Sequence, residues 1–184
     1  MRKVSFVALY DEYCLGVRYM ASVLKEAGHE VDLILFKSVV DITPADVPPA
    51  EKQEEGGYYS MATYCSPTEL KLLLETLQQQ APHVIGISFT SISFGLGKFL
   101  TQKIKAAFPD VPVVWGGVDS TVNVRENIKY TDVICIGEGE YPMRSLVNAL
   151  DKGKDYSKIP SLCVNKDGEI HINPVMRLPQ NLDE

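Results

Sequence analysis

Strand-length apolar segments alternate with helix-like segments along the chain, and this alternation restricts the possible folds more than any other feature. Nearly continuous apolar runs, typical of strands buried on both faces of a sheet, occupy residues 4–9, 30–36, 83–88, 111–115 and 132–136. Helical periodicity begins near residues 16, 66, 94 and 141. The repeated order predicts an α/β fold with a doubly wound, five-stranded parallel sheet in the flavodoxin-like (Rossmann-like) strand order.

Four of the predicted strands end in short loops of small or polar residues. These loops are residues 11–16, 88–91, 116–117 and 137–140. Because the carboxyl ends of parallel strands lie along one edge of the sheet, the four loops are expected to meet at a single crevice. The sequence therefore predicts a site there for a large ligand with many polar groups.

The totals of the chain exclude several classes of protein. A length of 184 residues suits one α/β domain, and a net charge of −6 without a basic cluster argues against nucleic-acid binding. No apolar run approaches the ~20 residues of a membrane span. Cysteines at positions 14, 65, 135 and 163 are too dispersed for a zinc knuckle or a disulfide framework. We expect a soluble protein of the reducing cytoplasm.

Two segments depart from the strand–helix rhythm. Residues 38–66 are rich in proline and charge, and we expect an insertion there, either a flap whose tyrosines touch a ligand or neighbouring domain or a floppy loop. Residues 161–172 read as a hairpin around a Lys-Asp-Gly turn, followed by an extended linker. The expected division is a binding domain at 1–158 and, at 159–184, a hairpin and linker toward a further C-terminal domain.

The loop motifs, in their order along the chain, resemble the cobalamin (vitamin B12)-binding domain that precedes a radical S-adenosylmethionine domain. The GxGxxG dinucleotide fingerprint and the P-loop are both absent from the sequence. That family marks its site with DxHxxG after the first strand, SxL or SxT after the third and GG after the fourth. This chain has Asp11 and Gly16 in a DxxxxG pattern, Ser88-Phe89-Thr90, and Gly116-Gly117. The stretch from Gly137 to Glu140 is similar to the GEGE signature of the radical-enzyme branch.

The resemblance implies cobalamin as the cofactor and a set of cofactor-binding residues on the four loops. Glycines let the backbone approach the nucleotide tail of cobalamin closely, and hydroxyl groups can hydrogen-bond a buried heterocycle or phosphate. The expected binding residues are Asp11, Tyr13, Cys14, Gly16, Val17, Ser88, Phe89, Thr90, Ser91, Gly116, Gly117, Val118, Gly137, Glu138 and Gly139. No catalytic residue and no metal ligand is expected among them.

Position 13 departs from the family pattern. Tyr13 stands where the wider family has the histidine that ligates cobalt from below. A phenol, with an unperturbed pKa near ~10, is a poor neutral ligand. We therefore expect cobalamin to bind base-off, with no histidine on cobalt and Tyr13 at most facing its lower side.

The resemblance also implies a larger enzyme. The chain has no CxxxCxxC triad for a 4Fe-4S cluster, so cluster and S-adenosylmethionine are expected only in a missing C-terminal radical domain or a separate catalytic chain. Such a parent enzyme is most often a methyltransferase, and some relatives rearrange rings instead. Two alternatives remain open: a flavodoxin-like domain that binds flavin or a nucleotide, and a non-catalytic interaction domain.

Overall fold

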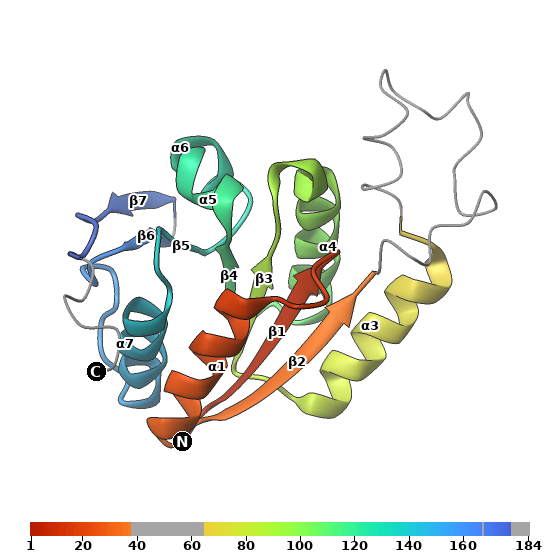
Figure 1. Cartoon of the computed structure of the whole chain (residues 1–184), viewed down its shortest axis with the longest axis horizontal. Coiled ribbons are helices and arrows are strands. Elements are labelled where there is room, and N and C mark those ends of the chain that lie inside the picture. The colour runs from red at the N-terminus through yellow and green to blue at the C-terminus, as the bar shows by residue number, and fades with distance from the viewer. Residues whose placement is uncertain (38–64, 167, 178–184) are drawn as a thin grey trace.

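A computed structural model describes residues 1–37, 65–166 and 168–177 of the chain (Figure 1). Its centre is a seven-stranded sheet in the order β2-β1-β3-β4-β5-β6-β7. The strands are β1 (Lys3–Leu9), β2 (Glu30–Phe36), β3 (Val84–Ser88), β4 (Val113–Gly116), β5 (Val133–Cys135), β6 (Leu162–Lys166) and β7 (Glu169–Ile172).

The first five strands are parallel, and their order confirms the predicted flavodoxin-like fold. β1 pairs with both β2 and β3, so the strand order reverses beside it. Ligands of doubly wound sheets bind at this kind of reversal, outside the carboxyl ends of the strands. The predicted hairpin is present as β6 and β7, and β6 pairs antiparallel with β5. The hairpin therefore extends the main sheet, while the expected division after residue 158 stays a prediction.

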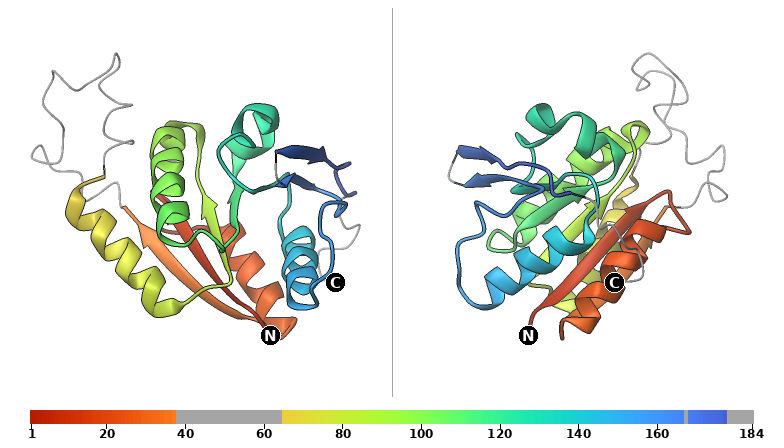
Figure 2. Two further views of the ribbon diagram at one scale, coloured as in Figure 1. Left: turned by 180° about the vertical axis from the view of Figure 1, so that it is seen from behind. Right: turned by 60° about the vertical axis from the view of Figure 1, so that its left-hand side comes forward.

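Helices cover both faces of the sheet (Figure 2). One face packs against α1 (Leu15–Glu26) and α7 (Glu140–Asp151), through apolar side chains that include Leu24 and Leu146. The opposite face packs against α3 (Pro67–Gln80) and α4 (Phe94–Ala107) around Trp115. Burial on both faces accounts for the nearly continuous apolar runs in the parallel strands.

Local signals fix the ends of these helices. Ser66 and Glu69 form a reciprocal capping box at the start of α3, in which each side chain accepts a hydrogen bond from the other's backbone N–H. Gly28, with φ of +85°, ends the turn that follows α1. Both features agree with the helix boundaries that the sequence predicts.

Three short helices were not predicted from the sequence: the 3-10 turn η4 (Ser91–Ser93), α5 (Val118–Val122) and α6 (Val124–Asn127). Each is shorter than two turns, so none can show an apolar period. α5 and α6 follow β4 directly and lie beside the carboxyl edge of the sheet (Figure 1).

The flap hypothesis falls on residues 38–64, which lie outside the described part of the chain. The same holds for the linker residues 178–184. Within the described residues, no helix has the length and apolar character needed to cross a membrane.

Candidate functional site

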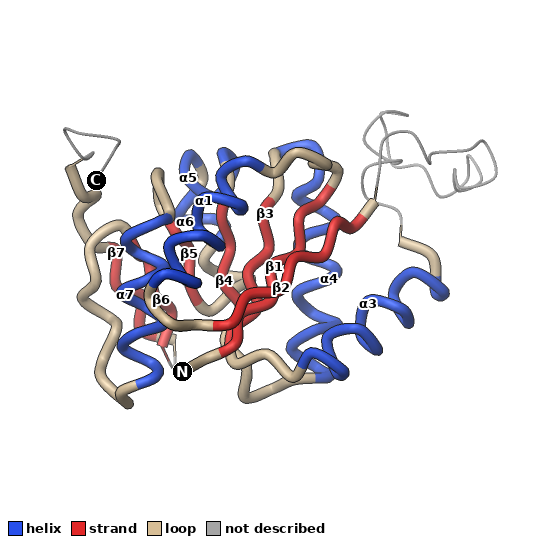
Figure 3. Tube along the Cα trace, turned by 60° about the horizontal axis from the view of Figure 1, so that its bottom comes forward, coloured by secondary structure: helices blue, strands red, loops and turns tan. Residues whose placement is uncertain are grey.

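The four predicted loops meet at one crevice at the carboxyl edge of the parallel strands, an edge that Figure 3 shows with its loops in tan. The crevice holds about 140 Å³. Its lining combines residues from all four loops and from α1: Asp11, Cys14, Gly16, Val17, Met20, Ser88, Gly116, Gly117, Cys135, Gly137, Glu138, Gly139 and Glu140. Ten of the fifteen residues expected from the sequence are among them.

The loop after β1 is held in a strained turn. Tyr10 and Cys14 have positive φ values of 56° and 35°, a region that residues other than glycine rarely adopt. The Asp11 carboxylate stabilises the turn, because its Oδ1 accepts a hydrogen bond from the Cys14 N–H at 2.7 Å. The turn buries Cys14 and leaves open space above Gly16, where a Cβ would have no neighbour within 4 Å. Strain of this kind is concentrated at binding sites.

The loop after β4 approaches the loop after β3 so closely that only glycine fits. Gly117 has φ of +99° and ψ of −179°, a conformation that only glycine adopts readily. A Cβ at this position would lie 2.3 Å from the carbonyl oxygen of Phe89. Its neighbour Gly116 faces open space instead, with nothing within 4 Å of an added Cβ. Gly117 therefore brings the backbones of the two loops into contact, and Gly116 leaves its own backbone accessible from the crevice.

Thr121 on α5 joins the last two loops, and the sequence analysis did not single it out. Its hydroxyl oxygen accepts a hydrogen bond from the Gly137 N–H at 3.0 Å and donates to the Gly117 carbonyl at 3.2 Å. Behind it, the buried Asp119 carboxylate accepts hydrogen bonds from the side-chain amides of Asn123 and Asn127. The only sequence signals for this cluster were an Asp two residues and a Thr four residues after Gly117. The segment is too short to show a helical period.

Three lining residues were not among the expected binding residues: Met20, Cys135 and Glu140, the last of which ends the predicted loop 137–140. Met20 comes from α1, and its sulfur is the nearest atom to where a Cβ of Gly139 would lie. Cys135 is the last residue of β5, and it is buried where it lines the crevice. Burial raises the pKa of the Cys135 thiol to about 12, and the carboxylates of Glu140 and Glu138 add to the shift. The thiol is therefore neutral at physiological pH.

Five expected residues do not line the crevice. The side chain of Phe89 packs edge-on against Trp115 in the core, with ring centroids 5.0 Å apart, and its backbone lies against Gly117. Thr90 and Ser91 are exposed beyond the end of β3. Tyr13 and Val118 are 79% and 67% exposed on the loops at either side. These two side chains form an apolar rim that a large ligand can cover.

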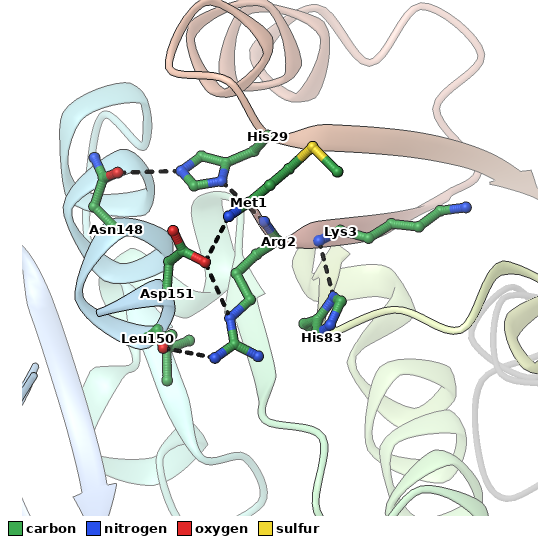
Figure 4. Close-up of polar contacts among 8 residues, drawn as sticks. All are labelled: Met1, Arg2, Lys3, His29, His83, Asn148, Leu150 and Asp151. Carbon is green, nitrogen blue, oxygen red and sulfur yellow. Dashed lines mark hydrogen bonds and ion pairs between the residues drawn. The ribbon is translucent and has the colours of Figure 1, made fainter. Parts of the chain in front are cut away.

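The histidines of the chain lie away from the crevice. His29 and His83 sit at the amino edge of the sheet, where their Nδ1 atoms accept hydrogen bonds from the backbone N–H groups of Arg2 and Lys3 (Figure 4). His171 is on β7. Among the residues that the structure describes, no three histidine, cysteine, aspartate or glutamate side chains are grouped to hold a metal ion. The crevice thus offers backbone, hydroxyls and carboxylates to a ligand, without an imidazole.

Comparisons of the sequence with protein families and with known proteins agree with one another. The sequence profile of the B12 binding domain matches residues 1–147. The chain is 32% identical over 107 residues to the cobalamin-dependent radical SAM methyltransferase TokK of Streptomyces tokunonensis, covering 55% of this chain and 16% of that protein. It is 25% identical over 173 residues to the uncharacterized methyltransferase PH0819 of Pyrococcus horikoshii, covering 92% of this chain and 32% of that protein.

Solved structures share the fold. The radical S-adenosylmethionine methyltransferase TsrM of Kitasatospora setae superposes with a TM-score of 0.72 at 17% identity, over 95% of this chain and 30% of that one. The cobalamin-dependent S-adenosylmethionine radical enzyme OxsB with aqua-cobalamin bound superposes with a TM-score of 0.63 at 18% identity. The match covers 97% of this chain and 23% of that one. The chain therefore spans about a third or less of the length of these relatives.

Proposed function

Because the chain belongs to the B12 binding domain family, we propose that its carboxyl-edge crevice holds cobalamin base-off, with no histidine on cobalt. The observation that carries this proposal is the glycine-lined crevice itself. Gly16 at the start of α1 and Gly116 at the end of β4 leave the backbone uncovered, and Gly117 allows a backbone approach that any side chain would block. An uncovered backbone offers hydrogen-bonding groups to the amides and phosphate of a large cofactor.

The residues present fit a corrinoid. Ser88 lines the crevice and can hydrogen-bond the nucleotide tail, while the amide groups at the start of α1 face the same space through Gly16 and Val17. Tyr13 and Val118 stand on the rim with their side chains exposed. Their apolar surfaces suit the face of a flat macrocycle, and Tyr13 would lie on the lower side of cobalt.

The positions of the histidines support a cobalt without an imidazole ligand. His29 and His83 are engaged at the opposite edge of the sheet, and His171 belongs to the terminal hairpin. A histidine ligand would have to come from the loop after β1, where Tyr13 stands. The base that cobalamin carries would then be seated in the protein and not on the metal.

We further propose that the chain is the cofactor-binding part of a larger radical S-adenosylmethionine methyltransferase. TokK and TsrM, which bear that name, extend well beyond the part that this chain matches. When bound, cobalamin supplies a cobalt centre that can carry a methyl group. This chain binds and orients that cofactor, and a 4Fe-4S cluster and S-adenosylmethionine belong to a partner domain or chain. The free cysteines of the described residues suit the reducing cytoplasm.

A visible absorption titration tests the proposal. Adding hydroxocobalamin to the purified chain should give saturable binding with the spectrum of the base-off form. A base-on spectrum would contradict displacement of the base, and spectral evidence for histidine coordination would contradict the role of Tyr13. A yellow chromophore bound in the same crevice would favour a flavin-binding domain.

A further inference from the structure

The residues that follow the terminal hairpin remain hydrogen-bonded to the domain. Residues 173–176, which we call the terminal segment, have no regular secondary structure. The Asn173 side-chain amide donates to the carbonyl oxygens of Ser157 at 2.8 Å and of Leu162 at 2.9 Å. The Asn173 backbone N–H donates to the same Leu162 carbonyl at 3.2 Å. The terminal segment is therefore fixed to β6 and to the connection before it.

Ser161 joins the terminal segment to the loop at residues 137–140. The Ser161 N–H donates to the Pro174 carbonyl at 2.9 Å, and the Ser161 hydroxyl accepts from the Met176 N–H at 2.9 Å. The Ser161 carbonyl accepts from the Ile136 N–H at 2.8 Å, directly before that loop. Ser161 is buried and has a positive φ of 60°, a strained conformation that persists only where the surrounding contacts impose it.

The loop that begins after Ile136 is held from two sides. The Ile136 N–H is bound by Ser161, and the N–H of the next residue, Gly137, donates to the Thr121 hydroxyl at 3.0 Å. Gly137 lines the crevice. Among the described residues, the side chain nearest to where a Cβ of Gly137 would lie is that of Val175, whose Cγ1 is 4.0 Å away. The terminal segment therefore runs beside the crevice.

The terminal segment presents apolar side chains to solvent at this place. Val175 is 60% exposed, and Met176 is 40% exposed. The crevice holds about 140 Å³, whereas pockets for drug-sized ligands hold about 300–1,000 Å³, so a corrinoid has to extend beyond the crevice. A ligand that extends past Gly137 meets Val175. Because hydrogen bonds already fix the backbone there, this contact does not require a flexible segment to be ordered first.

We propose that the terminal segment is a further wall of the cofactor site, in which Val175 contacts the bound corrinoid. Ser161 is the positioning residue that holds this wall against the loop at residues 137–140. The inference rests on the proposed function and adds residues that do not line the crevice itself. Neither residue lies on the four strand-end loops that the sequence motifs mark.

Hydroxocobalamin titrations of single and double variants of the chain test the proposal. Val175→Ala shortens a mostly exposed side chain, and we expect the affinity to fall at least about threefold. Ser161→Ala removes the acceptor of the Met176 N–H, and we expect a fall of at least the same size. The double variant should lose no more than Ser161→Ala alone, because residues that act together are not additive. Additive losses would overturn the role of Ser161, and unchanged affinity in Val175→Ala would overturn the contact.

Two matched controls distinguish positioning from a general loss of structure. Ser157→Ala also removes a buried hydroxyl from the connection before β6, but this hydroxyl donates to the Asp155 carboxylate at 2.7 Å. Ile170→Ala shortens an exposed side chain on β7 that lines no part of the crevice. Both controls should bind hydroxocobalamin as tightly as the unaltered chain. Losses of affinity in the controls equal to those in the variants would overturn the proposal.

Hydrogen exchange of the unaltered chain gives a test that needs no variant. Binding of hydroxocobalamin should slow the exchange of the backbone N–H groups at residues 175–177 at least about fivefold and leave β7 unchanged. Unchanged exchange at residues 175–177, in a chain that binds the cofactor saturably, would overturn the wall and leave the proposed function intact. Failure of hydroxocobalamin to bind would overturn the proposed function itself, and the inference with it.

Discussion

The two edges of the parallel sheet use their polar groups in opposite ways. At the amino edge, polar side chains pair with backbone groups: the Asp151 carboxylate accepts a hydrogen bond from the N-terminal ammonium of Met1 at 2.7 Å, and the Arg2 guanidinium donates to the Leu150 carbonyl at 2.9 Å (Figure 4). At the carboxyl edge, glycine loops surround a crevice, and Glu138 makes no hydrogen bond or ion pair with the residues that the structure describes. Paired groups stabilise the fold, and groups left accessible are available to a ligand.

Helix α7 connects the two edges and shows the contrast within one element. Its first residue, Glu140, lines the crevice. Near its other end, Asn148 accepts a hydrogen bond from His29, with a distance of 3.2 Å between Nε2 and Oδ1. Because the His29 Nδ1 accepts from the Arg2 N–H, the neutral ring carries its proton on Nε2. The comparison therefore predicts that changes at the amino edge affect stability and that changes at the carboxyl edge affect binding.

The largest effect should come from Gly117→Ala, which is the one change at the carboxyl edge that we expect to lower stability, because its glycine closes a backbone contact. The added Cβ would lie 2.3 Å from the fixed Phe89 carbonyl oxygen, in a conformation that strongly favours glycine. We expect a loss of more than about 3 kcal/mol in the free energy of unfolding, measured by urea denaturation. Unchanged stability would mean that the backbone contact between the loops after β3 and β4 does not exist.

Gly116→Trp should separate binding from stability. A Cβ at Gly116 meets nothing within 4 Å, so we expect an indole attached there to extend into the crevice that Gly116 lines. We expect cobalamin affinity to fall at least about a hundredfold, equivalent to about 2.8 kcal/mol, while the urea midpoint stays nearly unchanged. Gly116→Ala is the size control and should retain most of the affinity. Full affinity in the tryptophan variant would place the cofactor elsewhere.

His29→Ala should show the reverse behaviour at the amino edge. It removes the buried ring that accepts from the Arg2 N–H and contacts Asn148, and we expect a loss of about 1–3 kcal/mol in the free energy of unfolding. His83→Ala is the matched control, because His83 also accepts a backbone N–H but is exposed, and it should cost less. Cobalamin titrations of both folded variants should match the unaltered chain. A changed cobalamin spectrum in either variant would indicate that this histidine is a ligand of cobalt.

Asp151→Asn should have the smallest effect, and the size of that effect depends on pH. The hydrogen bond from the N-terminal ammonium, helped by the charge of Arg2, holds the pKa of Asp151 below its usual value. A carboxyl group with a lowered folded-state pKa stabilises the fold above its unfolded pKa of about 3.9, and this contribution is lost as the pH falls through the folded value. The stability difference between the two proteins should therefore shrink below about pH 4.

Stability measured at several pH values checks this. A difference that stayed constant from pH 7 to pH 3 would show that the contact at the amino edge does not depend on the charge of Asp151.

The fold was largely predictable from the sequence because doubly buried strands and helix caps leave strong local signals. The apolar runs gave the five parallel strands, and Gly28 marked the end of α1. The short helices α5 and α6 were missed because segments of five and four residues carry no period. Thr121 and the Asp119 cluster were missed with them.

The site was predictable where backbone geometry demands a residue type. Gly116 and Gly117 were recognised because a GG pair at a strand end has few other uses. Phe89 was expected at the ligand because of its place in the SxT motif, but its ring packs against Trp115. Met20 was not predicted as a lining residue, because in the sequence it is one of several apolar positions of α1. Only the fold places it beside β5. Sequence motifs locate the loops; three-dimensional packing decides which side chains line the space between them.

A crystal structure of the chain with hydroxocobalamin tests the central claim most directly. We predict the nucleotide tail along Ser88 and Gly116, its base seated in the protein and not on the metal, and Tyr13 on the lower side of cobalt. A corrinoid bound outside the carboxyl-edge crevice, or one with a histidine on cobalt, would contradict the account.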